Sequence, residues 1–318
     1  MILKRINKEI SLNNTFLITT HENPDGDAVG STLALANYLS GLGKKVTLYY
    51  RDPLPDLFTF LPMSEEVKTF IPKESYDICF VLDVGEFKRT GEEINGIGRV
   101  GKFINIDHHL ECEYFAEINL VDPEASATGA LIYRIIKAAG NEIDYPTALC
   151  IYTAIITDTG SFRYSNANPE AFAIAGEMVA LGVNAWYVAE RLYERQPPER
   201  LALLALALST LYVSPHGDWA SVTVTLDMYE KSGAKPELTD GFVNYPRSIR
   251  GVEVAVFFRE LQHGLIKVGF RSKGKVNVSA IALTFNGGGH HNAAGCNISG
   301  SLDDVKNIIY AQLENLFI

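Results

Sequence analysis

The sequence predicts an α/β protein of two domains: a first domain built on a parallel sheet with helices on both faces, and a smaller α+β second domain. The chain has 318 residues, which favours two domains. In its first half, continuous apolar runs alternate with segments of helical periodicity, as in parallel strands buried between helices. Beyond residue 213, apolar and polar residues alternate, which is typical of strands with one buried face.

The first domain is expected to span residues 1–182. Its predicted strands are the apolar runs 16–20, 45–50, 78–82 and 103–106. Helices are predicted over 29–39, from an N-cap at Ser126 to Gly140, from Pro146 to about Thr157, and from Asn168 to Gly182. The segment that begins at Pro146 is apolar nearly all round, which favours a buried helix, although its β-branched residues leave a strand open.

A helical linker is expected over residues 183–212, because two helical segments, 184–195 and 199–211, are broken at Pro197-Pro198. The second domain would then be 213–318, with strands at 220–226, 252–258 and 266–270. Its last helix is predicted to begin after Ser301, with Asp304 in the capping-box position.

Composition narrows the classes of partner. The net charge of −10 opposes long-range attraction to a nucleic-acid backbone, so we expect no long duplex as ligand and favour a small or short anionic substrate. No apolar run reaches the roughly 18 residues that a membrane span needs. The four cysteines are far apart and form no C-x-x-C pair, so they are interpreted as reduced thiols of a cytoplasmic protein.

The stretch 21–31 follows the first predicted strand and carries three potential metal ligands, His21, Asp25 and Asp27. Gly26 permits a sharp turn that can direct both carboxylates into one cavity. Ligand sites of open α/β sheets form at this end of the strands. The alternative is a turn in which one Asp only caps the following helix, and the stretch alone does not decide between the two.

Further acids and histidines follow other elements of the first domain: Asp83 and Asp107-His108-His109 follow two strands, and Asp158 ends a helix. Carboxylates crowded into one cleft repel each other, and two divalent cations would offset that charge. Bridged metals roughly 3.5–4 Å apart are a standard device for activating water against a phosphoryl group. Mixed carboxylate and imidazole ligands favour Mn²⁺, with Mg²⁺ as the alternative.

These motifs resemble those of the DHH phosphoesterase superfamily. Asp107-His108-His109 is similar to the motif that names the family, 21–27 to its first motif, Asp83 to its second and 158–162 to its fourth. The segment 287–295 resembles the glycine-rich signature of the DHHA1 domain. The chain resembles in particular the bacterial nanoRNase/pAp phosphatase (NrnA-like) group, with five motifs in the same order along essentially the whole chain.

The resemblance implies two metal sites that share Asp83. The first ligand set would be His21, Asp25 and Asp83, and the second Asp27, Asp83, His108 and Asp158. The implied catalytic residues are His109, near the reacting phosphate, Asp107, which would support His108, and His290.

Substrate binding is implied for the second domain, at Gly287, Gly288, Gly289 and His290 and at Arg271 and Ser272. The glycines would expose backbone amides to an anion, and Arg271 would hold a terminal phosphate. The alternative is a flexible surface loop beside a solvated basic strand end. Asn286 stands where the signature usually has another glycine, and Asn tolerates the left-handed conformation better than most residues.

The predicted function is hydrolysis of short 5′-phosphorylated oligoribonucleotides, dinucleotides such as pGpG or pApA, or the nucleotide bisphosphate pAp. Alternatives are a cyclic-dinucleotide phosphodiesterase and a RecJ-like single-strand exonuclease, although RecJ-like enzymes carry additional nucleic-acid-binding domains. The non-enzymatic alternative is a nucleotide sensor, which should have lost ligands that are all present here. A homodimer is left open.

Overall fold

A computed structural model describes residues 1–95 and 97–317, without the side chains of Asn95 and His290. The chain divides into two compact units, one from Met1 to Arg195 and one from Gln196 to the C-terminus. Both helices of the predicted linker form, but they belong to different units. Helix α7 (Ala185–Tyr193) buries Val188 in the core of the first unit, and α8 (Pro198–Leu208) buries Leu203 in the second.

The described part of the first unit holds a parallel sheet of order β3-β2-β1-β4-β5-β6. Its strands are β1 (Thr15–Thr19), β2 (Lys45–Tyr49), β3 (Val67–Lys68), β4 (Tyr76–Leu82), β5 (Val100–Asp107) and β6 (Ile118–Val121). Besides α7, its α-helices are α1 (Ile2–Leu12), α2 (Gly26–Gly41), α3 (Glu92–Asn95), α4 (Thr128–Ala138), α5 (Tyr145–Asp158) and α6 (Pro169–Ala180). The four strands expected from apolar runs are confirmed, and the segment after Pro146 is a helix.

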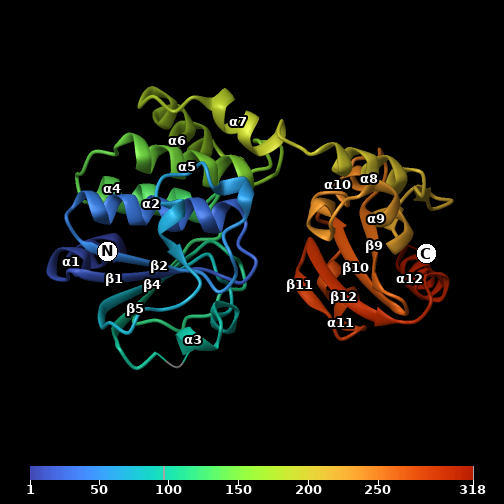
Figure 1. The fold of residues 1–318 in the computed structure, drawn as a ribbon, viewed down its shortest axis with the longest axis horizontal. Helices are drawn as coiled ribbons and strands as arrows, with labels where there is room; N and C mark the ends of the chain where they lie inside the picture. The colour runs from blue at the N-terminus through green and yellow to red at the C-terminus, as the bar shows by residue number, and fades with distance from the viewer. Residues whose placement is uncertain (96, 318) are drawn as a thin grey trace. The chain divides into compact units, whose positions relative to one another are not determined.

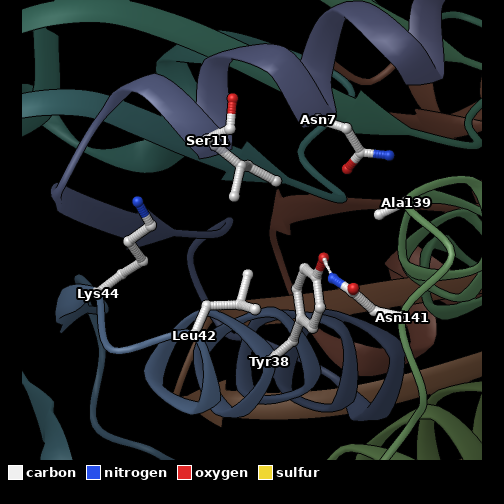
Figure 2. Close-up of a pocket in the computed structure, with 8 residues that line it drawn as sticks. Asn7, Ser11, Tyr38, Leu42, Lys44, Ala139 and Asn141 are labelled. Atoms are coloured by element: carbon white, nitrogen blue, oxygen red, sulfur yellow. Dashed lines mark hydrogen bonds between the residues drawn. The ribbon is translucent and has the colours of Figure 1, made fainter.

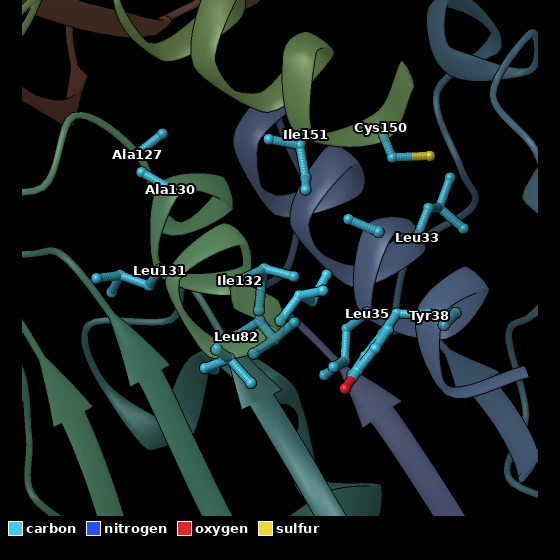
Figure 3. Packing of buried hydrophobic residues seen from close by; sticks show 14 of the residues in the cluster. Leu33, Leu35, Tyr38, Leu82, Ala127, Ala130, Leu131, Ile132, Cys150 and Ile151 are labelled. Atoms are coloured by element: carbon cyan, nitrogen blue, oxygen red, sulfur yellow. The ribbon is translucent and has the colours of Figure 1, made fainter. Parts of the chain in front are cut away.

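Helices α2, α4 and α5 cover one face of this sheet (Figure 1), and their apolar side chains form the largest core. Figure 3 shows side chains from all three helices gathering above the strands, around Leu82 at the end of β4. The opposite face buries a second cluster that includes Leu17, Cys79 and Val81, near the short α3.

Glycines on α2 let it pack closely on α5. A Cβ atom at Gly30 would lie 2.8 Å from the carbonyl oxygen of Cys150, and one at Gly26 would overlap the side chain of Thr157. Because α2 runs against α5 without side chains between them at these points, the start of α2 lies next to the end of α5. This brings the acids of the 21–31 stretch near Asp158.

The described part of the second unit forms a mixed sheet of order β11-β12-β10-β9-β8-β7, in which only β8 and β9 are parallel neighbours. Its strands are β7 (Tyr212–Val213), β8 (Trp219–Val224), β9 (Val254–Gln262), β10 (Leu265–Ser272), β11 (Gly288–His290) and β12 (Ala293–Ser299). Its other helices are α9 (Leu226–Ser232), α10 (Asn244–Arg247), α11 (Val278–Leu283) and α12 (Leu302–Phe317). Helices α11 and α12 cover one face of the sheet and close its core.

Helix caps follow the sequence at some positions and not at others. The Ser301 hydroxyl accepts a hydrogen bond from the Asp304 amide (3.2 Å) and donates one to its carboxylate (2.6 Å), as the capping box predicts. The predicted N-cap at Ser126 is wrong. Helix α4 begins one residue later than that cap implies, after Ala127, and it has no side-chain cap from its own N-cap residue. Helix α1 was not predicted, although the two residues that it buries, Ile6 and Ile10, stand four positions apart, as in an amphipathic helix.

A cavity of about 380 Å³ lies between α1, the end of α2 and the turn after α4 (Figure 2). Its wall includes Asn7 and Lys44, and Tyr38, whose hydroxyl accepts a hydrogen bond from Asn141 (2.7 Å). Lys44 precedes β2, so the cavity lies at the amino ends of the strands, whereas the predicted ligands gather at their carboxyl ends.

Among the described residues, no single helix combines the length and apolar content needed to cross a membrane. Helices α6 and α7 reach both only as a pair, with a bend of 110° between them.

Candidate metal centre

The candidate metal centre lies where the strand order reverses. Strands β1 and β4 are neighbours, and the chain proceeds from them toward opposite edges of the sheet. Ligand sites of open parallel sheets form at such switch points, beyond the carboxyl ends of the strands. His21 and Asp25 follow β1, Asp83 follows β4, and Asp107 ends β5.

His21 and Asp25 form a group with Asp83 in which the ligand atoms lie within 4.8 Å of one another. His21 contacts the Glu22 carbonyl through Nδ1 (2.7 Å), and its Nε2 lies 3.9 Å from Oδ2 of Asp83. Asp25 Oδ1 also accepts the amides of Asp27 and Ala28, at 3.1 Å each, and so caps α2. Asp25 therefore does both things that the sequence left open: it caps α2, and it belongs to a potential ligand group.

Asp27 is fixed by the start of a different helix. Its carboxylate accepts the backbone amides of Thr128 (2.6 Å) and Gly129 (3.0 Å) and the hydroxyl of Ser31 (2.7 Å). These amides belong to the first turn of α4, where the helix dipole favours a negative charge. Asp27 thus supplies the cap that the sequence led us to expect from Ser126.

Asp83 occupies the centre of the site in an unusual backbone conformation. Its φ is +59°, in the left-handed region that few residues other than glycine adopt. Its Oδ1 accepts the Thr128 hydroxyl (3.0 Å) and lies 3.6 Å from Nε2 of His108, while Oδ2 faces His21. The two oxygens of one buried carboxylate therefore face two different ligand groups.

The other group consists of Asp27, His108 and Asp158. Nε2 of His108 lies 3.6 Å from Asp27 and 3.7 Å from Asp158, and its Nδ1 lies 3.2 Å from the Ala125 carbonyl. Asp158 Oδ2 accepts a hydrogen bond from Nδ2 of Asn166 (2.9 Å), which also binds the Ser126 carbonyl.

Asp107 supports His109, and the expectation that it would support His108 is wrong. Its Oδ1 contacts both the amide (2.8 Å) and Nδ1 (2.7 Å) of His109, and its Oδ2 accepts the amides of Val84 (3.0 Å) and Gly85 (2.7 Å). His109 follows Asp107 by two residues in a turn, so its ring can reach back to that carboxylate. The ring of His108 points instead to the carboxylates of Asp27 and Asp158. His109 also forms a group with Asp83 and His108.

The electrostatics of this site fit divalent cations. Burial raises the pKa of Asp27, Asp83 and Asp158 to about 7 each, and neighbouring carboxylates add to the effect. Burial would lower the pKa of His108, but Asp27, Asp83 and Asp158 outweigh it and raise the pKa to about 9. Asp27 and Asp83 are buried and Asp158 is half-buried, and the three acids together face too little positive charge. Carboxylate and imidazole donors are also a suitable ligand set for Mn²⁺ or a related ion.

The predicted substrate residues of the second unit lie at the end of β10, on β11 and just before β11. Arg271 and Ser272 end β10, where the buried Ser272 hydroxyl donates to Oδ1 of Asn292 (3.0 Å). The glycine-rich segment was expected to be a loop, but Gly288 to His290 form β11, paired with β12. A Cβ atom at Gly289 would lie 2.5 Å from the Ala293 oxygen, so close strand packing accounts for that glycine. Asn286 adopts φ +57°, as its tolerance of this region predicts.

Two contributors escaped the sequence analysis. Thr128 falls inside the helix predicted from Ser126 to Gly140, and Asn166 falls between two predicted helices, but neither was singled out. Neither residue is a usual metal ligand, and neither stands at a motif spacing from the ligands. Only the fold reveals that Thr128 holds Asp83 and that Asn166 holds Asp158. The side chain of the predicted catalytic residue His290 lies outside the described residues.

Comparisons with known proteins agree with this arrangement. Residues 15–155 match the DHH family, N-terminal domain, and residues 220–315 match the DHHA1 domain. The chain is 37% identical over 284 residues to the bifunctional oligoribonuclease and PAP phosphatase NrnA of Thermus thermophilus, covering 89% of this chain and 84% of the relative. It is 30% identical to the protein of the same name from Bacillus subtilis, covering 97% and 96%.

A solved structure shares the whole fold. An exopolyphosphatase-related protein from Bacteroides fragilis superimposes with a TM-score of 0.93 at 31% identity, covering 98% of this chain and 95% of that one. The switch-point cluster of acids and histidines on a parallel sheet, which could hold divalent metal ions, fits the class of phosphoesterases. The chain belongs to the DHH family, with a C-terminal DHHA1 domain.

Proposed function

We propose that this phosphoesterase hydrolyses short 5′-phosphorylated oligoribonucleotides, including dinucleotides, and the bisphosphate pAp, with two Mn²⁺ ions. The observation that carries the proposal is the position of Asp83, whose two carboxylate oxygens face two separate groups of potential ligands. The substrate class is supported by relatives that share most of the chain and are named oligoribonuclease and PAP phosphatase.

In this proposal, one ion is held by His21, Asp25 and Asp83. The other is held by Asp27, Asp83, His108 and Asp158. Bound there, two divalent ions would offset the carboxylate charge and polarise water and the phosphoryl oxygens. Mn²⁺ is favoured over Mg²⁺ because imidazole belongs to both sets.

The contribution of the protein itself is to hold the side chains of the site in fixed orientations. Asp107 holds Nδ1 of His109 at 2.7 Å, so Nε2 is the ring nitrogen that we assign to a phosphoryl oxygen. Since the Nδ1 proton faces Asp107, Nε2 donates only when His109 is protonated; burial opposes that state, but the hydrogen bond to Asp107 outweighs it and raises the pKa of His109. The hydrogen bond that the protonated ring donates there would strengthen as charge develops on the oxygen. Thr128 and Asn166 keep Asp83 and Asp158 in place through hydrogen bonds of 3.0 and 2.9 Å. In the second unit, we propose Arg271, Ser272, the Gly287–Gly289 backbone and His290 as substrate contacts.

The proposal is tested with purified protein that has been freed of metal by a chelator. Mn²⁺ should restore hydrolysis of pAp and pApA, and Mg²⁺ should restore less. Longer RNA and cyclic dinucleotides are assayed in parallel. Turnover after exhaustive chelation would overturn the metal assignment, and a preference for cyclic dinucleotides or long RNA would overturn the substrate assignment.

A further inference from the structure

One cation beside the candidate metal centre has no role so far. Arg89 lies in a short 3₁₀ helix, Phe87–Thr90, in the loop that follows β4. Its carbonyl accepts the amide of Glu22 (2.8 Å), so its backbone lies next to the segment that carries His21. Its side chain is half-buried and folds back, and its Nη1 donates to the carbonyl of Val84 (3.2 Å). Arg89 thus connects the loops that follow β1 and β4, both of which carry potential ligands.

The guanidinium of Arg89 and the ring of His109 approach the same stretch of backbone. Arg89 contacts the Val84 carbonyl, and a Cβ atom at the next residue, Gly85, would lie 3.8 Å from Cγ of His109. Burial is the main cause that lowers the pKa of His21, and the nearby charges of Arg89 and His109 add to it. The guanidinium thus lies close to the ring that we assign to a phosphoryl oxygen.

Two neighbouring cations are paired with acids, and Arg89 is not. Lys88 forms an ion pair with Glu86, and Nη1 of Arg51 lies 2.6 Å from a carboxylate oxygen of Glu22. Within the part of the chain that the structure describes, Arg89 forms no ion pair, and one backbone carbonyl accepts from its guanidinium. A guanidinium carries five N–H groups, so most of the donors of Arg89 remain for an anion.

A positive charge beside a metal centre is unfavourable unless an anion lies between them. The proposed ion at His21 and the guanidinium of Arg89 are like charges, so each weakens the binding of the other. A phosphoryl oxygen between them would attract both, and guanidinium groups form strong hydrogen bonds with such oxygens. The alternative is that Arg89 only fastens its loop through the Val84 carbonyl, which is a task that needs no charge.

We propose that Arg89 is a catalytic residue that donates hydrogen bonds to a non-bridging oxygen of the phosphoryl group undergoing hydrolysis. The inference rests on the proposed function, because it takes the metal centre as the place of hydrolysis. The ligand class is a phosphomonoester or phosphodiester, together with inorganic phosphate as the product of monoester hydrolysis. Every substrate carries this group, so Arg89 acts on all of them, whereas Arg271 is assigned to a terminal phosphate.

The test compares Arg89→Met with wild-type protein on pAp, pApA and a chromogenic phosphodiester. On all three, kcat should fall roughly 100-fold, as for loss of one donor to a developing oxyanion. Affinity of the Mn²⁺-loaded protein for inorganic phosphate, measured by calorimetry, should fall roughly tenfold, as for one lost charge-assisted contact. Affinity for Mn²⁺ without phosphate, measured by electron paramagnetic resonance, should stay the same or increase, because a neighbouring positive charge has been removed.

Lys88→Met is the matched control, because Lys88 precedes Arg89 in the same turn, is exposed and is paired with Glu86. It should change none of these values. Arg89→Gln keeps a neutral donor for the Val84 carbonyl, so it should lose as much activity as Arg89→Met, and it takes the place of that variant if Arg89→Met does not fold.

Three outcomes would overturn the inference. Wild-type kcat in Arg89→Gln would show that the charge is not needed. Lower Mn²⁺ affinity in Arg89→Met would show that the residue only holds its loop. Wild-type kcat and phosphate affinity in Arg89→Met, with an active wild-type protein, would refute this role of Arg89 alone. Wild-type protein that hydrolyses none of the substrates with Mn²⁺ would refute the proposed function, and this inference with it.

Discussion

The candidate metal centre of the first unit and the proposed substrate face of the second are built in opposite ways. In the first unit, Asp27 and Asp107 are each held by at least three hydrogen bonds, and both are buried. In the second unit, Arg271 extends from the end of β10 and is half-buried. Chemistry on a phosphoryl group needs ligands held within a fraction of an ångström, whereas long side chains on a rigid sheet can adapt to several ligands.

This difference predicts how substitutions behave. A change in the first unit should affect all substrates alike, because every substrate needs the same reacting centre. A change in the second unit should affect only those substrates that carry the phosphate it contacts. The following experiments test whether substitutions in the two units differ in this way.

The largest effect is expected at Asp83. Asp83→Asn removes the charge, keeps the shape and suits the φ of +59° better than Ala would. Activity should fall on every substrate, by more than the roughly 10–100-fold that an outer contact typically costs. In chelator, the variant should unfold at the same temperature as the wild type or higher, because it relieves crowding among buried carboxylates.

Steady-state kinetics on pAp, pApA and a chromogenic phosphodiester, with calorimetry of the metal-free proteins, would check both parts. His21→Ala, which removes a ligand from one group only, is the comparison. If Asp83→Asn retains more activity than His21→Ala, Asp83 does not bridge the two sites.

The next effect should appear on selected substrates only. Arg271→Ala removes a charge-assisted contact worth roughly 1.5–3 kcal/mol. Because that contact persists from ground state to transition state, KM for pAp should rise more than kcat falls. A chromogenic phosphodiester has no terminal phosphate, so its cleavage should be nearly unchanged.

Lys273→Ala is the matched control for Arg271, since Lys273 lies two residues further on and donates to the Ile249 carbonyl (3.0 Å). It should leave both substrates unaffected. Equal losses on pAp and the chromogenic ester for Arg271→Ala would make that residue structural or catalytic, and the contrast between the two units would then fail.

The sequence predicted the fold better than the contacts inside the site. Apolar runs and helical periodicity located the central strands and the helices α2, α5 and α6, because burial dictates those patterns. Short edge strands such as β3 and β7 bury little and leave no such pattern. The strand β11 was missed because glycines give no strand signal, and its pairing with β12 arises only in the folded chain.

The potential ligands were identifiable because acids and histidines recur after strands in a recognisable order. Their supports were not, because hydrogen bonds between residues about a hundred positions apart, such as those from Thr128 and Gly129 to Asp27, depend on tertiary packing. The partner of Asp107 was wrongly predicted for a related reason. Adjacent histidines look alike in sequence, and only the turn of the chain decides which one faces back to the carboxylate.

A smaller effect is expected for the supporting residue Thr128. Thr128→Val keeps the shape and the backbone amide that Asp27 needs, but it removes the hydroxyl that binds Asp83. Affinity for Mn²⁺ should fall roughly 10–100-fold, as for other outer contacts of metal sites. Metal titration followed by electron paramagnetic resonance measures this directly.

Thr153→Val controls for the loss of a buried hydroxyl. Thr153 is fully buried in α5, and its hydroxyl donates to the Leu149 carbonyl of the same helix (2.9 Å). Both variants should lose roughly 0.5–1.5 kcal/mol of unfolding free energy. Only Thr128→Val should lose metal affinity, and Thr128→Ser should restore it. Similar Mn²⁺ affinity in both Val variants would show that the Thr128 hydroxyl merely stabilises the fold.

The smallest effect is expected for Asn166. Its Nδ2 donates to Asp158 Oδ2 and to the Ser126 carbonyl, at 2.9 Å each, so it ties the acid at the end of α5 to the segment before α4. Asn166→Ala should weaken Mn²⁺ binding roughly tenfold, at the low end for outer contacts, because His108 still faces Asp158.

Asn168, two residues after Asn166, is the matched control. Its Oδ1 accepts the Ala171 amide (2.9 Å) and caps α6, and its Nδ2 donates to the Glu124 carbonyl (2.8 Å). Asn168→Ala should therefore cost about 1 kcal/mol of stability, as for a lost helix cap, without changing Mn²⁺ affinity. If both variants lower Mn²⁺ affinity equally, the loop between α5 and α6 acts on the site only through its folding. Asn166 would then have no specific role in holding Asp158, and the rigid network of the first unit would end at the ligands themselves.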